Sequence, residues 1–250
     1  MACRTIVMCV ILGLLAAAAS AVPFDFYYLM LMWPGSYCTN TGGCCMPMYG
    51  NPAEDFHIES FQTFNLSINR PAVRCKNDSP FDINKLDKIG DSLKQHWSDI
   101  KCPSGDSSDA WKSAWNSFGV CSGLNQLDYF KAALDLRKQA DVLGALKEQD
   151  IRPDSLYSPE DIKRAVRQKL GVTPAVACRS GPGSQKHLHQ VILCVDEDAK
   201  AFIECPKLPA TTCPDSIVFQ TFHTWMLVNS TAAAFDHSKK ILLPTETALH

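Results

Sequence analysis

The chain has 250 residues, a formal net charge of −2 and 46% hydrophobic residues, which fits one globular domain with a sizeable core. The nearly balanced charge gives no electrostatic reason to expect tight, non-specific nucleic-acid binding, so no DNA partner is predicted. Twelve cysteines without a zinc-binding pattern are too many for a reduced compartment and indicate the secretory pathway.

Residues 1–21 have the pattern of a secretory signal peptide. Arg4 precedes an apolar run from Ile6 to Ala19, and Ala19-Ser20-Ala21 is a small-x-small cleavage site. The run is shorter than the roughly 20 apolar residues that a membrane span requires, and no later segment reaches that length. We therefore expect cleavage after Ala21 and an extracellular or vacuolar protein without a membrane span.

The mature chain is predicted to begin with a buried strand. Phe24 to Pro34, FDFYYLMLMWP, is a continuous aromatic and aliphatic run that ends in a turn at Pro34-Gly35. Further along, apolar residues recur at helical spacing from Ile83 to Trp97, which predicts an amphipathic helix over about 82–98.

The segment from Asp109 to Cys121, DAWKSAWNSFGVC, predicts a short helix. Trp111 and Trp115 recur at helical spacing, and Gly119 stands where a C-terminal cap is expected. Oxygens for an N-cap are offered by Ser107, Ser108 and Asp109. At about 100° per residue, positions 113, 114, 117 and 118 share one edge of this helix. The side chains at these four positions therefore point in one direction.

The second half of the chain is predicted to pass from helices to strands. Residues 125–149 suggest one long helix or two abutting ones, and Ser158-Pro159 begins another helix that Gly171 ends. Apolar runs over 187–195, 201–205 and 216–222 predict strands. With no internal repeat, we expect one domain over 22–223 and a C-terminal tail over 224–250.

Three asparagines stand in glycosylation sequons that no proline blocks. They are Asn65, Asn77 and Asn229. Sequons this short arise often by chance, so we expect two of the three to carry a glycan.

Ten cysteines remain after cleavage of residues 1–21, and an even number in a secreted chain predicts a disulfide framework. Their spacing alone leaves the pairing open. Only Cys44 and Cys45 are near neighbours, so zinc is not expected. His187 and His189 alternate on a predicted strand, but no carboxylate or thiol completes a ligand set, so we interpret them as part of a surface strand. No metal and no cofactor are predicted.

Two segments together resemble the ribonuclease T2 family, in particular its plant S-like members. They are WPGSYC over 33–38 and the frame of two tryptophans, a glycine and a cysteine over 111–121. The resemblance implies an α+β fold with a central, largely antiparallel sheet flanked by helices. It also implies a cysteine pairing: Cys38-Cys44, Cys45-Cys102, Cys75-Cys121, Cys178-Cys213 and Cys194-Cys205.

The same resemblance implies that the residues of the active site have been replaced. Family members carry D-F-x-I-H-G-L-W-P and W-x-H-E-W-x-K-H-G-T-C motifs, which hold three histidines, a glutamate and a lysine. One imidazole removes a proton from RNA and another supplies one, while lysine and glutamate stabilise charge. The five matching positions are occupied here by Glu59, Ser113, Ala114, Ser117 and Phe118. Met32 replaces a glutamine that many members carry for base binding, and we interpret it as a core residue.

None of these replacements titrates as histidine does near neutral pH. Glu59 also repels a phosphate, which the family histidine would attract. On a regular strand, His57 and Glu59 would share one face about 7 Å apart. That displacement is too large for His57 to take over proton transfer, which needs contact within about 3 Å.

Three functions are compatible with the sequence. The first is a secreted or vacuolar ribonuclease-like protein without RNA-cleaving activity, retained in stress, defence or storage. The second is weak binding of single-stranded RNA or nucleotides without cleavage, with Phe61, Phe64 and Phe118 as stacking surfaces. The third is an active endoribonuclease with relocated histidines, drawn from His57, His96, His187, His189 and His223.

Overall fold

The structure is a computed structural model that describes residues 24–38, 43–48, 51–76 and 79–228. The predicted signal peptide and the predicted acceptors Asn77 and Asn229 lie outside these ranges. Asn65 is described: it is 7% exposed, and its side-chain oxygen accepts a hydrogen bond from the Ile68 amide. Glycosylation of Asn65 stays a prediction.

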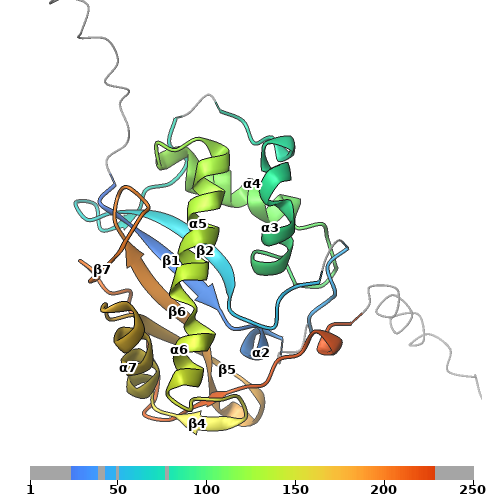
Figure 1. Ribbon diagram of the computed structural model, residues 1–250, viewed down its shortest axis with the longest axis vertical. Helices are drawn as coiled ribbons and strands as arrows, with labels where there is room; N and C mark the ends of the chain where they lie inside the picture. The colour runs from blue at the N-terminus through green and yellow to red at the C-terminus, as the bar shows by residue number, and fades with distance from the viewer. Residues whose placement is uncertain (1–23, 39–42, 49–50, 77–78, 229–250) are drawn as a thin grey trace, which may run out of the picture.

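Three long strands form the centre of one sheet (Figure 1). β1 (Phe26–Met32) lies between β2 (His57–Asn65) and β6 (Lys186–Val195) and is antiparallel to both. The shorter strands are β3 (Arg70–Pro71), β4 (Ser155–Tyr157), β5 (Ala175–Ser180), β7 (Phe202–Ile203) and β8 (Ile217–Phe219). The pairing of β6 with β8 is parallel and the other strand pairings are antiparallel, which confirms the largely antiparallel sheet.

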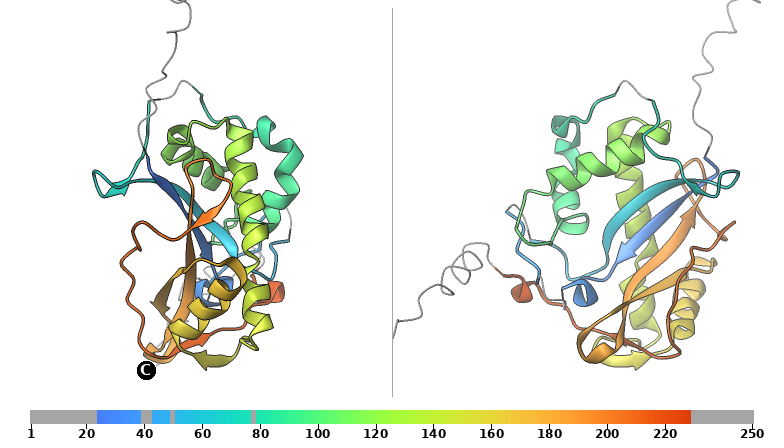
Figure 2. Two further views of the ribbon diagram at one scale, coloured as in Figure 1. Left: turned by 60° about the vertical axis from the view of Figure 1, so that its left-hand side comes forward. Right: turned by 180° about the vertical axis from the view of Figure 1, so that it is seen from behind.

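Helices flank this sheet and complete the expected α+β class (Figures 1 and 2). The α-helices are α2 (Pro34–Tyr37), α3 (Gly90–His96), α4 (Ser108–Ser117), α5 (Gln126–Ala140), α6 (Val142–Glu148) and α7 (Pro159–Leu170). The 3₁₀ turns are η2 (Ile83–Ile89), η3 (Gly119–Cys121), η4 (Pro182–Ser184) and η5 (Thr224–Met226). α5 and α6 follow one another across one face of the sheet, and α3 and α4 gather beside one end of α5 (Figure 1).

Local sequence signals explain where the helices begin and end. Asp141 has a φ of 36° and its carboxylate caps the Gly144 amide, so the predicted 125–149 helix is divided into α5 and α6. Ser158 caps the Asp161 amide at the start of α7, and Gly171 ends that helix with a φ of 75°. The predicted 82–98 helix is instead a 3₁₀ turn followed by α3.

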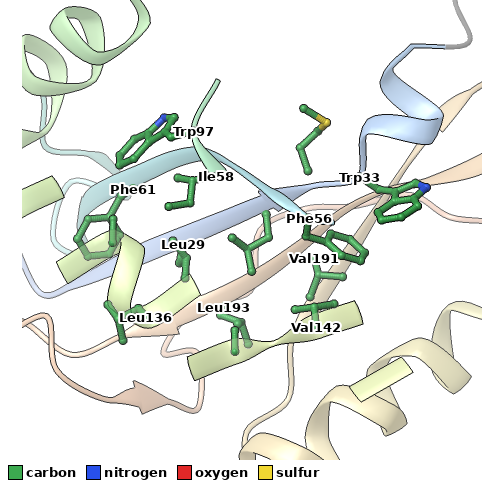
Figure 3. Packing of buried hydrophobic residues seen from close by; sticks show 14 of the residues in the cluster. Leu29, Trp33, Phe56, Ile58, Phe61, Trp97, Leu136, Val142, Val191 and Leu193 are labelled. Atoms are coloured by element: carbon green, nitrogen blue, oxygen red, sulfur yellow. The ribbon is translucent and has the colours of Figure 1, made fainter. Parts of the chain in front are cut away.

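The core lies on both faces of the central strands. Leu29 and Phe61 are fully buried on the face that α5 covers, where Leu136 packs (Figure 3). Phe26 and Phe64 belong to a second buried cluster with other residues of the sheet. Burial on both faces explains why β1 reads as a continuous apolar run rather than an alternating one.

The described residues contain five disulfides. They are Cys38–Cys44, Cys45–Cys102, Cys75–Cys121, Cys178–Cys213 and Cys194–Cys205. These are the pairs that the family resemblance implies. Each disulfide of a secreted domain typically contributes about 2–4 kcal/mol to the free energy of unfolding.

Residues 224–228, which begin the predicted tail, contact the body of the protein. The Val228 amide donates to the Cys44 carbonyl, and the Met46 amide donates to the Val228 carbonyl. The Glu54 carboxylate accepts from the Thr224 amide. The chain is thus attached to the domain as far as Val228.

Candidate functional site

One edge of α4 is fixed in the core by two tryptophans. The Trp111 Nε1 group donates to the Trp97 carbonyl at 2.7 Å, and Trp115 Nε1 donates to the Ser79 carbonyl at 2.9 Å. Both rings are buried. A Cβ on Gly119 would lie 2.2 Å from the Trp115 ring, so only glycine lets the chain pass this close to it.

The other edge of α4 carries the positions that the family resemblance matches to catalytic residues. Ser113 is exposed, whereas Ala114, Ser117 and Phe118 are half-buried. Ala114 and Phe118 pack against the hydrophobic core. This edge therefore offers hydroxyl, methyl and phenyl groups and no side chain that titrates near neutral pH.

Glu59 stands on a β-bulge of β2. Met30 pairs with Ser60 and Leu31 pairs with Ile58, so Glu59 is the extra residue between two successive pairs. Its carboxylate is exposed and accepts a hydrogen bond from the Gln190 side chain. A bulge interrupts the alternation of a strand and re-aims the side chains beside it.

The bulge overturns the expectation that His57 and Glu59 share one face. His57 is fully buried, and its Nε2 lies 2.8 Å from the Ala53 carbonyl oxygen. Ile58 and Glu59 instead line a common pocket. His57 is therefore further removed from the replaced site than a regular strand would place it.

The pocket beside Glu59 has a volume of about 270 Å³ and lies between β2, α2, the segment after α3 and the start of α4. Its walls are formed by Met32, Tyr37, Ile58, Glu59, Trp97, Ser98, Asp99, Ile100, Lys101 and Ala110. Figure 3 shows Trp97 above Ile58 at the edge of the core. Met32 is 5% exposed, in line with its interpretation as a core residue, and it also contributes to the pocket wall.

The residues that line this pocket carry more acidic than basic side chains, and the Arg179 guanidinium lies over the Tyr37 ring, 5.2 Å from its centroid. Glu59 and Asp99 face a single cation, Lys101, among the lining residues. Burial raises the pKa of the Tyr37 hydroxyl, and the Asp99 and Glu59 carboxylates raise it further. A phosphate in the pocket would meet two carboxylates.

None of the described histidines lines this pocket. Burial lowers the pKa of His57 to about 4, and the positive charge of nearby Arg137 acts in the same direction. Burial likewise lowers the pKa of His96 to about 4. Both imidazoles are therefore neutral at physiological pH and lie beside the buried ion pair of Arg137 and Asp55.

The other three histidines differ in their surroundings, and one of them, His189, lies beside a residue of the pocket wall. His187 is 3% exposed, so the interpretation of 187–189 as a surface strand is wrong for this residue, which β5 and β8 enclose. Burial lowers the pKa of His189 to about 4, and its ring stacks on Tyr37 with 6.4 Å between ring centroids. His223 Nδ1 lies 3.0 Å from the Glu54 carboxylate, at the C-terminal segment.

The prediction of stacking surfaces for a base is wrong for two of the three phenylalanines. Phe61 is fully buried and stacks on Tyr27 at 4.3 Å between ring centroids. Phe64 is 7% exposed and packs on Phe26. Both faces of β2 are covered, so neither ring can receive a base, whereas Phe118 stays half-buried at the end of α4.

The part of the chain that the structure describes holds no group of three or more histidine, cysteine, aspartate or glutamate side chains that could bind a metal ion. Within the same ranges, no helix is long and apolar enough to cross a membrane.

Comparison with known proteins identifies the fold. Residues 24–205 match the Ribonuclease T2 family. The chain belongs to the ribonuclease T2 family. It is similar to extracellular ribonuclease LE of Solanum lycopersicum, with 37% identity over 221 residues that cover 87% of this chain and 96% of the relative.

Two further similarities bear on the site of this family member. The crystal structure of RNase NT in complex with 5'-AMP matches with a TM-score of 0.76 and 34% identity, covering 80% of this chain and all of that one. A ribonuclease-like storage protein of Panax ginseng is 29% identical over 197 residues, covering 78% of this chain and 80% of the relative.

Sequence reasoning missed several residues of the pocket. Asp99 and Lys101 line it, yet they belong to no motif with a fixed spacing, and Tyr37 lies within WPGSYC but was not expected to line a pocket. The available signal was Trp97, an aromatic residue followed by a run of polar residues before α4. That signal is too general to predict a pocket.

Proposed function

We propose that this protein is a secreted or vacuolar ribonuclease T2-like protein that does not cleave RNA and that acts in storage, stress or defence. The observation that carries the proposal is the pocket beside the β2 bulge. Glu59 stands there in place of the histidine implied by the family motif, and no described histidine lines that pocket.

RNA cleavage by attack of the 2'-hydroxyl needs one group to remove a proton and another to supply one. Each positioned acid or base is worth roughly 10²–10⁴ in rate. The serines, alanine and phenylalanine on the edge of α4 supply neither. The imidazoles of His57, His96 and His189 are neutral near pH 7 because burial lowers the pKa of each to about 4, and none of the three lines the pocket.

Weak nucleotide binding in the same pocket is the second candidate. The tyrosine and tryptophan in its wall, Tyr37 and Trp97, favour it, because aromatic rings can contact a base. The carboxylates of Glu59 and Asp99 oppose it by repelling phosphate. We expect single-stranded RNA and nucleotides to bind weakly at most.

Storage is the role that the relatives favour most directly, since one of them is named a ribonuclease-like storage protein. A storage protein needs a stable fold and no active site. Five disulfides and a core on both faces of the sheet provide the first requirement.

The test is cleavage of single-stranded RNA by the oxidised mature protein between about pH 4 and 8, the range in which histidine titrates. Extracellular ribonuclease LE serves as the active control. We expect no cleavage above a buffer blank. Binding of a non-cleavable oligonucleotide to the same sample separates a retained nucleotide pocket from a purely storage role, and cleavage near the control's rate would refute the proposal.

A further inference from the structure

A hairpin at the end of β2 exposes aliphatic side chains. We call residues 66–74, which join and flank β2 and β3, the 66–74 hairpin. Leu66 is 39% exposed, Ile68 is 52% exposed and Val73 is 50% exposed. Figures 1 and 2 show the hairpin projecting beyond the end of the sheet, away from the helices.

Hydrogen bonds hold this hairpin in shape. The Asn65 side-chain oxygen accepts from the Ile68 amide at 3.0 Å, and the Asp25 carboxylate accepts from the Leu66 amide at 2.6 Å. At the base, the Thr63 hydroxyl donates to the Ala72 carbonyl at 2.7 Å. Side-chain hydrogen bonds thus hold the turn in a conformation in which its aliphatic groups point outward.

The hairpin also concentrates positive charge in a chain whose net charge is −2. Arg70 and Arg74 of the hairpin and Lys76 just after it are exposed, and no acidic residue occurs between positions 65 and 76. The Lys207 ammonium contacts the Asn69 side chain from a neighbouring loop. The carboxylate of Asp25 is the acidic group in contact with the hairpin, and it already accepts the Leu66 amide.

We propose that the 66–74 hairpin docks on an anionic phospholipid surface. Exposed aliphatic side chains flanked by arginine and lysine are the combination that seats a peripheral protein at the boundary between headgroups and acyl chains. Each cation near such a surface contributes about 1 kcal/mol, which is about a five-fold change in affinity. A narrow, convex hairpin suits a deformable lipid surface better than the flat interface of a folded protein.

This surface is separate from the pocket beside Glu59 and does not depend on whether RNA is cleaved. The predicted glycosylation acceptor Asn65 immediately precedes the hairpin, and its glycan would lie beside Leu66. Ser67→Ala removes the sequon and leaves the hydrogen bond of Asn65 intact, because Asn65 itself is retained.

The test is sedimentation of the full mature protein with vesicles of phosphatidylcholine alone and with about one third phosphatidylserine, at low and physiological salt. The wild-type chain and the Ser67→Ala variant are measured side by side. We expect the Ser67→Ala variant to bind the anionic vesicles at least as tightly as wild type and to show no binding to the neutral vesicles. Its affinity for the anionic vesicles should fall as the salt concentration rises.

Variants of the Ser67→Ala chain locate the contact. The double variant Arg70→Gln, Arg74→Gln is expected to lower the affinity for anionic vesicles about 25-fold, because each of the two cations contributes about five-fold. Ile68→Ser tests the aliphatic tip and is expected to weaken binding at least five-fold. Leu156→Ser and Lys147→Gln are the matched controls, an exposed aliphatic and an exposed cation elsewhere on the surface, and are expected to have no effect.

Failure of the Ser67→Ala chain to bind anionic vesicles at low salt would overturn the proposal, as would equal losses in the control variants. Retention on immobilised polyglutamate without vesicle binding would also overturn it and would instead assign the hairpin to an acidic protein. Circular dichroism of each variant distinguishes loss of binding from loss of the fold.

Discussion

The two edges of α4 differ in burial and in the side chains that they carry. The edge with Trp111 and Trp115 is buried, and each indole donates a hydrogen bond to a backbone carbonyl of another segment. The edge with Ser113 and Ser117 is more exposed and holds none of the family's titratable groups. On the proposed function, the residues that maintain the fold have been kept while those that perform chemistry in the family have been replaced, so the two sets of residues should be physically separable.

Restoring the five family residues tests this separation with the largest expected effect. The variant combines Glu59→His, Ser113→His, Ala114→Glu, Ser117→Lys and Phe118→His. If the scaffold still holds the catalytic geometry, cleavage of single-stranded RNA should rise at least about 100-fold over wild type, because each acid or base contributes roughly 10²–10⁴.

The matched control for that variant carries Gln at position 59 and the same four substitutions on α4. It should stay near the wild-type rate, since one of the two proton-transfer groups is absent. A folded five-residue variant without any gain would show that the bulge and its Gln190 contact have altered the site beyond its side chains.

Truncating the buried edge of α4 should affect stability instead of activity. Trp115→Ala removes a fully buried indole and is expected to lower the free energy of unfolding by about 3–5 kcal/mol. Ser113→Ala on the exposed edge should change it by less than about 0.5 kcal/mol. Urea denaturation followed by circular dichroism measures both, and equal losses would contradict the separation.

The lowered pKa of buried His57 predicts that the free energy of unfolding depends on pH. The pKa of His57 is lowered to about 4, so the unfolded chain, with a histidine pKa near 6.5, binds more protons between these values. The contribution of His57 to the free energy of unfolding is fully present above about pH 6.5. It falls by about 3 kcal/mol in total as the pH drops to about 4.

Urea denaturation between about pH 4 and 7 measures this slope. His57→Gln should flatten it, although the variant will be less stable at neutral pH because the Ala53 contact is changed. Ser113→Ala is the control at an exposed position without a titratable side chain and should leave the slope unchanged. An unchanged slope in His57→Gln would show that other groups dominate acid unfolding.

The smallest expected effect concerns the charge of the pocket. Glu59→Gln removes one carboxylate from the wall while retaining a side chain of the same shape. Affinity for 5'-AMP should rise about five-fold, corresponding to about 1 kcal/mol for one charge at contact distance in water. Isothermal titration calorimetry measures the change, with Glu197→Gln as an exposed control; equal affinities would place the nucleotide elsewhere.

Sequence reasoning predicted the regular parts of the fold better than the details of the site. The caps at Ser158 and Gly171 predicted α7 because capping is a local effect. The bulge at Glu59 depends on how β2 pairs with β1, which no local pattern records. Phe61 and Phe64 were misassigned for the same reason: the sequence of a strand does not show what covers its second face.

The pairing of β1 also affects how the protein folds during its synthesis. β1 is the first strand to leave the ribosome, yet Met30 pairs with Ile192 on β6. At about 5–20 residues per second, the partner strand follows only after roughly 8–30 s. During that interval one edge of the apolar strand FYYLMLM has no partner from β6. We therefore expect chaperones to bind the nascent chain until β6 has been made.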